Sequence, residues 1–167
     1  RAARRARSTE SPADSLQSQR APAAARRASG RASHADQDLA TWLKKVYAPI
    51  DRLLGQVINP FAAELRALSA DPYDDALMEA FCTYLDQSRS RLNKVKSLFQ
   101  SIPTPASARG FGLSVYHCFS QVEDAVTEFE RYTMGYVDSY LHDGREMIRE
   151  AKQRRKRLQD ERRRLEI

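Results

Sequence analysis

The clearest potential for chemistry lies in ten basic side chains gathered near the C-terminal end of the chain. Arg matches the geometry of phosphate and carboxylate groups and stays charged at neutral pH, so this group could bind an anionic surface. Acids four positions away, as in Glu150–Arg154 and Asp160–Arg164, could instead pair with these cations on a solvated helix, at ~0.2–0.5 kcal/mol per pair. The predicted partner-binding residues are Arg145, Arg149, Lys152, Arg154, Arg155, Lys156, Arg157, Arg162, Arg163 and Arg164.

Two acidic segments are the candidates for a metal site. Residues 71–75 (DPYDD) precede a helical pattern, where carboxylates cap backbone N–H groups and favour the helix dipole. Residues 123–130 carry four carboxylates, but a metal site in a helical bundle also needs Glu-x-x-His motifs, which the sequence lacks. We therefore assign the first segment to capping and the second to the solvent face, and expect neither a metal nor another cofactor.

Histidine and cysteine give no catalytic pattern. His117 and Cys118 are adjacent and would point about 100° apart on a helix, so they cannot form a nucleophile–base pair by themselves. Cys82 and Cys118 lie in apolar helical patterns and are predicted to be buried free thiols, with a disulfide between neighbouring helices as the alternative. There is no glycine-rich phosphate loop and no G-x-S-x-G motif. We expect no catalytic residue, no small-molecule substrate and no enzymatic activity.

Three tyrosines, Tyr132, Tyr136 and Tyr140, recur at a spacing of four. Such a face could stack on bases or on a ligand. We favour the other interpretation, in which the rings belong to the seam of a helical bundle and their hydroxyls reach water or a neighbouring helix.

The elements that would position these residues are helices. Apolar residues recur at intervals of three and four over 36–58, 60–68, 72–100 and 112–165, and no useful stretch alternates with period two. Residues 102–112, with two prolines and two glycines, read as a loop. We predict an all-α antiparallel helical bundle of three long helical segments plus one short segment.

Two prolines shape the first half of this pattern. Pro49 interrupts an amphipathic helix and is expected to kink or restart it, because proline in a helix interior costs ~3 kcal/mol. Asn59-Pro60 resembles a cap followed by a first-turn proline, which predicts that 60–68 is a separate short helix.

The last segment is predicted to form one long helix that projects from the bundle. A helix over 112–165 would be about 80 Å long, whereas its neighbour over 72–100 would be about 43 Å. The longer helix would outrun the shorter near residues 140–145, where the basic character begins. Because apolar residues thin out there, deletion of 145–167 is expected to leave the bundle folded.

Charge divides the chain into three parts. Residues 1–35 carry a net charge of +6, residues 36–144 carry −5, and residues 145–167 carry +5. We therefore expect a basic disordered Arg/Ala/Ser-rich tail (1–35), a helical bundle domain (36–144) and a basic helical extension (145–167). The chain begins at Arg1, and the tail resembles part of a transit peptide, the flank of a lost membrane segment or a linker.

The best functional interpretation is a non-enzymatic helical-bundle subunit that docks into a larger assembly of protein partners through basic terminal arms. One alternative is a module that binds rRNA or DNA through the basic C-terminal helix. Another is a membrane-tethered or organellar bundle whose N-terminal segment has been removed, and contact with an anionic membrane surface is less favoured. We favour a reducing intracellular compartment or the mitochondrial matrix, with exposure in the cell envelope as the other option.

Overall fold

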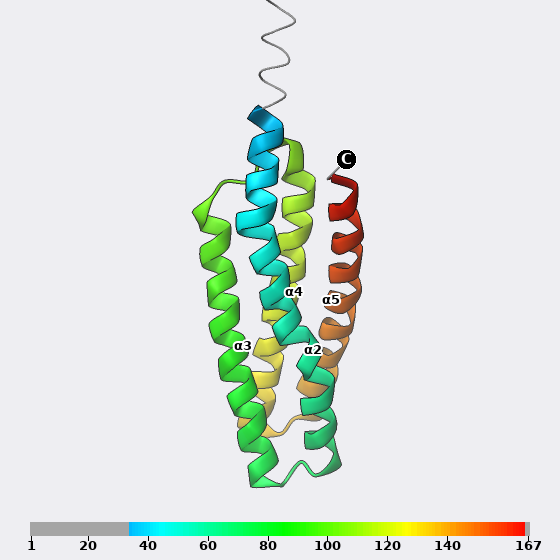
Figure 1. Cartoon of the computed structure of the whole chain (residues 1–167). Helices are drawn as coiled ribbons and strands as arrows, with labels where there is room; N and C mark the ends of the chain where they lie inside the picture. Colours follow the sequence, from blue (N-terminus) through cyan, green and yellow to red (C-terminus); the bar gives the residue numbers. More distant parts are fainter. Residues whose placement is uncertain (1–33, 166–167) are drawn as a thin grey trace, which may run out of the picture. The chain divides into compact units, whose positions relative to one another are not determined.

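The computed structural model describes residues 34–165. Contacts divide the chain into Arg1–Asp36 and Gln37–Ile167, and the second unit holds the helical bundle. No strand occurs in the described range. The predicted all-α antiparallel bundle is confirmed, and its four long helices are α2 (Ala48–Ala70), α3 (Asp75–Ser101), α4 (Arg109–Gly135) and α5 (Asp138–Leu165) (Figure 1).

The chain passes Pro49 without a break. Helical residues lead into η1 (Leu43–Tyr47), a π-helical turn that continues directly into α2. The N–H of Ala48 bonds to the carbonyl of Leu43, five residues back. Pro49 has no N–H to offer the carbonyl four residues before it, and a wider turn accommodates this loss. The expected kink or restart is therefore replaced by a π turn.

Pro60 lies inside α2, so the prediction of a separate short helix over 60–68 is wrong. Phe61, Leu65 and Leu68 are buried on the face that already buries Leu54. Each such side chain contributes ~1.5–3 kcal/mol on burial, which together exceeds the ~3 kcal/mol cost of an internal proline. Pro60 itself is exposed, so water can reach the backbone around it.

The loop before α4 is shorter than predicted. After Ser101 the chain turns through residues 102–105 and a 3₁₀ turn, η2 (Ala106–Ala108), before α4 begins at Arg109. Phe111 is buried, with its ring centroid 5.0 Å from that of Tyr47 and 6.1 Å from that of Trp42. Burial of this ring favours helix where the glycines and prolines alone suggested a loop.

Phe129 of α4 lies at the centre of the core. Its ring stacks on Phe61 of α2 at 4.5 Å between centroids and meets the edge of Phe81 of α3 at 5.9 Å. Phe119 is also buried, whereas Leu53 and Phe99 are only partly buried. One ring thus joins three helices, as expected for a single core.

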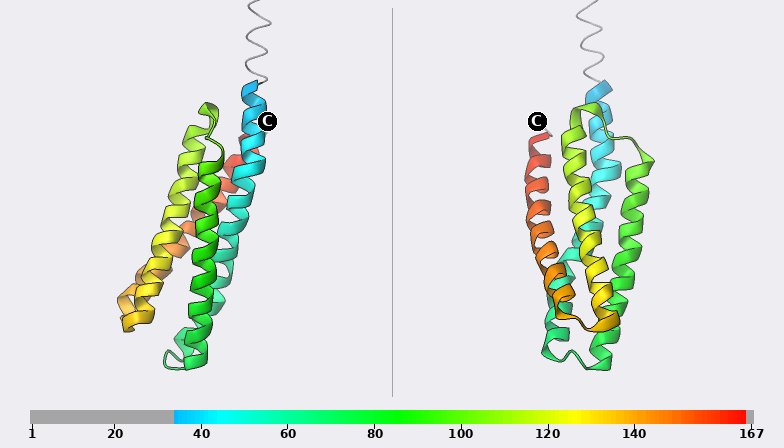
Figure 2. Two further views of the ribbon diagram at one scale, coloured as in Figure 1. Left: turned by 90° about the vertical axis from the view of Figure 1, so that its left-hand side faces the viewer. Right: turned by 180° about the vertical axis from the view of Figure 1, so that it is seen from behind.

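The predicted long helix over 112–165 is two helices, and its expected projection from the bundle is wrong. Tyr136 adopts the left-handed conformation (φ 55°), and its N–H bonds to the carbonyl of Tyr132 at 2.8 Å, which closes the end of α4. A left-handed residue after a helix reverses the chain, although glycine is its usual occupant. Helix α5 therefore returns alongside α4 (Figure 2).

Helix α5 packs into the core rather than extending beyond it. Ile148, Ala151 and Leu158 are buried. Helix α5 continues through Gly144 without a break. A Cβ at Gly144 would lie only 2.4 Å from Cε1 of Phe129, so the glycine lets α5 approach α4 closely. Deletion of 145–167 should consequently damage the core, contrary to the expectation from the sequence.

Candidate functional site

A groove between α2 and α5 gathers basic side chains over an apolar floor. It has a volume of about 430 Å³, within the range of ligand-binding clefts. Cations come from both helices, and no acidic residue lines the groove. The lining residues are Ile58, Asn59, Phe61, Ala62, Leu65, Arg66 and Ser69 of α2, and Arg145, Ile148, Arg149 and Lys152 of α5.

The groove has four cations. Three of them share one face of α5, and the fourth, Arg66, comes from α2. Arg145, Arg149 and Lys152 stand four and three residues apart, which places them on adjacent turns. Arg149 pairs with Glu146 at 2.9 Å, an exposed contact of little energetic weight. Within residues 34–165, no ion pair neutralises Arg66, Arg145 or Lys152.

The floor of the groove is recessed. Ile58, Phe61, Leu65 and Ile148 line the groove and are each at most 5% exposed, so they lie below its charged side chains. Ala62 is exposed and lies among them. A side chain entering the groove would meet hydrocarbon below and positive charge around it.

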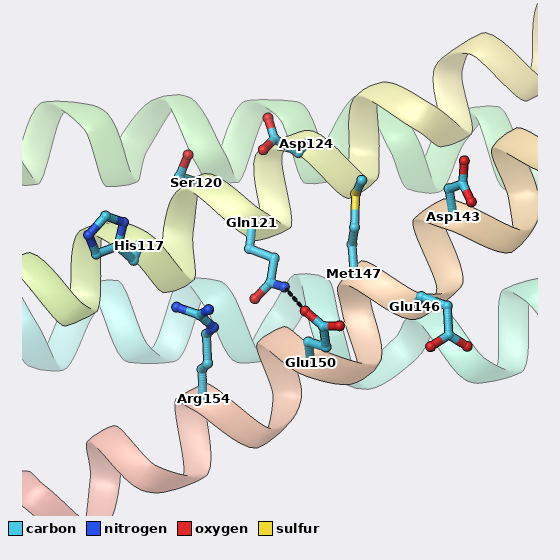
Figure 3. A pocket seen from close by; sticks show the side chains of 9 residues that line it. All are labelled: His117, Ser120, Gln121, Asp124, Asp143, Glu146, Met147, Glu150 and Arg154. Atoms are coloured by element: carbon cyan, nitrogen blue, oxygen red, sulfur yellow. Dashed lines mark hydrogen bonds between the residues drawn. The ribbon is translucent and has the colours of Figure 1, made fainter.

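The other flank of α5, which faces α4, is acidic. The cleft there is lined by Asp124, Asp143, Glu146 and Glu150, with Arg154 towards one end (Figure 3). Gln121 donates a hydrogen bond to Glu150 across the cleft at 2.6 Å. The acids are spread along the cleft, and no group of three or more His, Cys, Asp or Glu side chains in the described residues could hold a metal ion.

Arg155, one of the predicted partner-binding residues, faces α2. Its guanidinium group bonds to Asp51 at 2.9 Å, and the amide of Gln159 reaches the same carboxylate at 3.2 Å. Gly55 makes room, because a Cβ there would lie 2.6 Å from Nη2 of Arg155. Arg155 thus anchors α5 to α2, and it stands apart from the cations that line the groove.

The remaining predicted cations lie outside the α2–α5 groove. Arg154 and Arg157 border a smaller cleft on the α4 side. The Arg162 guanidinium lies 5.8 Å from the ring centroid of Tyr47, and Arg163 pairs with Asp160 at 3.5 Å. Two further side chains, Lys156 and Arg164, are exposed. The structure therefore brings together three of the ten predicted residues in the groove, namely Arg145, Arg149 and Lys152.

The acids considered for a metal site have structural partners. Asp74 caps α3, because its Oδ1 accepts the N–H of Leu77 at 3.0 Å. Arg89 of α3 bonds to Glu130 of α4 at 2.9 Å, and Lys96 of α3 pairs with Glu123 at 2.7 Å. The capping interpretation of residues 71–75 is confirmed. The expected solvent face of α4 is corrected for Glu123 and Glu130, which tie α4 to α3.

Cysteine and tyrosine also have structural roles. Both cysteines are free, and Cys118 is buried, with its thiol 3.6 Å from the carbonyl of Ala151. Burial raises the pKa of this thiol to about 11, so it stays protonated and unreactive at neutral pH. Tyr132 is buried as predicted for a seam residue, whereas Tyr136 lies in the turn and stacks on Tyr73 at 6.3 Å between centroids.

Sequence reasoning missed Arg66 and the apolar floor. Arg66 is the one cation in the second half of α2, and it lies more than seventy positions from the other groove cations. Ile58, Phe61, Leu65 and Ile148 carry the signal of ordinary core residues. Only the pairing of α2 with α5 turns them into one site.

Comparison with known proteins gives one match. Residues 34–166 match the family described as the cyanobacterial DnaJ chaperone, C-terminal domain. This range includes all four long helices and the groove. No curated protein matches the chain, and no solved structure does.

Proposed function

The chain belongs to the family of the cyanobacterial DnaJ chaperone C-terminal domain, and we propose that it is a non-enzymatic interaction domain that docks protein partners of a chaperone assembly. The docking surface is the basic side of α5 that faces α2. The observation that carries this proposal is the cluster of Arg66, Arg145 and Lys152, whose charges no acid in the described residues neutralises.

The rigid placement of α5 supports a docking role. Ile148 and Ala151 bury one side of the helix, and the Asp51–Arg155 bond holds it to α2. A basic surface on a fixed helix loses little conformational freedom when a partner binds, which favours affinity. By contrast, a free arm would have to become ordered when the partner binds, and the loss of conformational entropy would weaken the affinity.

The alternative function, nucleic-acid binding, would use the same basic side chains. The test must therefore distinguish protein docking from nucleic-acid binding. We would tag the full chain, express it in cells that naturally contain it, and identify co-purifying proteins after nuclease treatment. The key variant combines Arg145→Glu with Arg149→Glu, and the control combines Lys156→Glu with Arg164→Glu, which makes the same change in charge outside the groove.

The proposal requires a defined set of proteins that survives nuclease and is lost only in the groove variant. Loss of all partners on nuclease treatment would favour the nucleic-acid function. Equal loss in both variants would show that net charge, rather than this surface, governs association.

A further inference from the structure

We propose that the α2–α5 groove binds an acidic amphipathic helix of a partner protein. This inference rests on the proposed function and specifies the chemistry of the partner. It rests on two properties of one surface. Every charged side chain on the rim of the groove is basic, and the side chains of its floor are apolar. A ligand that satisfies both must carry carboxylates beside hydrocarbon.

The rim determines the charge and the spacing of the occupant. Arg145 and Lys152 are seven residues apart on α5, about 10 Å along the helix axis. Arg66 contributes from the opposite wall. Acids on adjacent turns of a bound helix would match this spacing, and Arg can bind a carboxylate through two parallel hydrogen bonds.

The floor argues for a protein rather than a membrane. A surface that inserts into a bilayer exposes large apolar side chains, but the exposed large apolar residues of the described chain all lie outside α5 and outside the groove. Here the apolar surface is recessed below the charges. A recessed floor accepts side chains that project from a partner, as in helix-in-groove recognition.

The floor also argues against single-stranded nucleic acid. Bases stack on exposed aromatic rings, and the only ring that lines the groove, Phe61, is 4% exposed. Phosphates could reach the rim, but they would leave the apolar floor unused. The complementary ligand therefore presents aliphatic or aromatic side chains between its acids.

The test measures binding of synthetic peptides to the full chain by fluorescence anisotropy. The probe is a fluorescein-labelled helical peptide of about 15 residues, long enough to hold some helix, with Leu on one face and Glu flanking it. A scrambled peptide of the same composition keeps the charge and loses the apolar face. Poly-uridine RNA and phosphatidylglycerol vesicles serve as the other anionic probes.

Two variants separate the rim from the floor. Arg145→Glu with Arg149→Glu replaces two of the four rim cations by acids and so cancels the positive charge of the rim, and Ala62→Trp fills the groove while leaving every charge in place. Lys156→Glu with Arg164→Glu is the charge-matched control. Ala62 is exposed, so the variant should fold, and its helical circular dichroism and melting temperature would verify this.

We expect the amphipathic peptide to bind more tightly than the scrambled one, and each groove variant to weaken its binding by about tenfold or more. The control variant should bind like the parent. Equal binding of both peptides, or full binding to Ala62→Trp, would overturn the inference. The inference would also be overturned if RNA or vesicles bound more tightly than the peptide and if Ala62→Trp left their affinity unchanged.

The two proposals can fail separately. The chain could bind the amphipathic and scrambled peptides equally well, while natural partners are still lost from Arg145→Glu with Arg149→Glu. In that case the basic surface docks proteins by another chemistry. If the peptides discriminate but no natural partner depends on the groove, the proposed function fails.

Discussion

Two glycines allow α5 to lie close against its neighbours. Gly144 faces the ring of Phe129, and Gly55 faces the guanidinium group of Arg155. In both places a methyl group would meet another atom at less than 3 Å. The two contacts differ in how easily they can adjust, because Phe129 is fully buried whereas the Arg155 side chain is long and flexible.

Gly144→Ala should destabilise the protein, since Phe129 cannot move without disturbing Phe61 and Phe81. Overpacking of this kind costs ~1–3 kcal/mol in the free energy of unfolding, which offsets or exceeds the ~1 kcal/mol that alanine gains in a helix. Gly110→Ala is the control, because Gly110 lies in α4 and a methyl group there would have no atom within 4 Å. Urea unfolding of both variants measures the difference, and equal stabilities would contradict the close contact.

Cys118 should make the protein less stable in alkali. Burial raises the pKa of this thiol from 9.0 to about 11, so between these values the folded state keeps a proton that the unfolded state has lost. The free energy of unfolding is therefore unaffected by this group below about pH 9 and falls as pH rises, by on the order of 1–3 kcal/mol.

The check is the slope of stability against pH from 8 to 11 in the parent and in Cys118→Ala. The variant should show a smaller slope. It should keep some slope, because burial also raises the pKa of Tyr84, to about 12. Parallel curves for parent and variant would show that Cys118 ionises as readily in the folded state as in the unfolded state.

At the scale of elements, one ion pair joins helices that are distant in sequence. Asp51 and Arg155 are 104 residues apart, and their side chains are 22% and 20% exposed. Two charges shielded from water attract each other more strongly than two exposed ones. Gln159 also bonds to the same carboxylate, so Asp51 is the hub of the contact between α2 and α5.

A double-mutant cycle of Asp51→Ala and Arg155→Ala should give a coupling energy of about 1–2 kcal/mol. Asp160 and Arg163 form the matched control, because that pair is 53% and 77% exposed and should couple by well under about 1 kcal/mol. Chemical unfolding of the four single and two double variants measures both values. Equal coupling in the two pairs would mean that the Asp51–Arg155 contact does not hold α5 in place.

For the whole unit, α5 belongs to the core. Its removal would uncover the face of α4 around Phe129 and leave Asp51 without its guanidinium partner. The three buried side chains Ile148, Ala151 and Leu158 would also be lost. At ~1.5–3 kcal/mol for each large apolar side chain, this approaches the ~5–15 kcal/mol by which small domains are stable.

A chain ending at Gly144 should therefore unfold at a much lower temperature than the parent or lose cooperative melting. A chain ending at Asp160 keeps Leu158 and Arg155 and should melt close to the parent. Circular dichroism with thermal melting compares the two. A cooperative, parent-like melt of the shorter chain would restore the view that residues 145–167 form an appendage.

The sequence by itself determined the all-α class and most of the core, because the three-and-four spacing of residues such as Val46, Phe81 and Phe119 depends only on local geometry. It also determined where positive charge is concentrated. It did not determine the ends of every helix. It did not reveal the turn at Tyr136, because a tyrosine in the left-handed conformation has no local signature of the kind that glycine gives.

The turn at Tyr136 determines the contacts between α5 and the other helices. By sending α5 back along the bundle, it buried Ile148, paired Arg155 with Asp51, and placed Arg145 opposite Arg66. Such contacts join residues about eighty to one hundred positions apart, and they form only when chain reversal brings two apolar faces together. Tertiary packing therefore turned a basic sequence segment, for which the sequence predicted a projecting helix, into one wall of a groove.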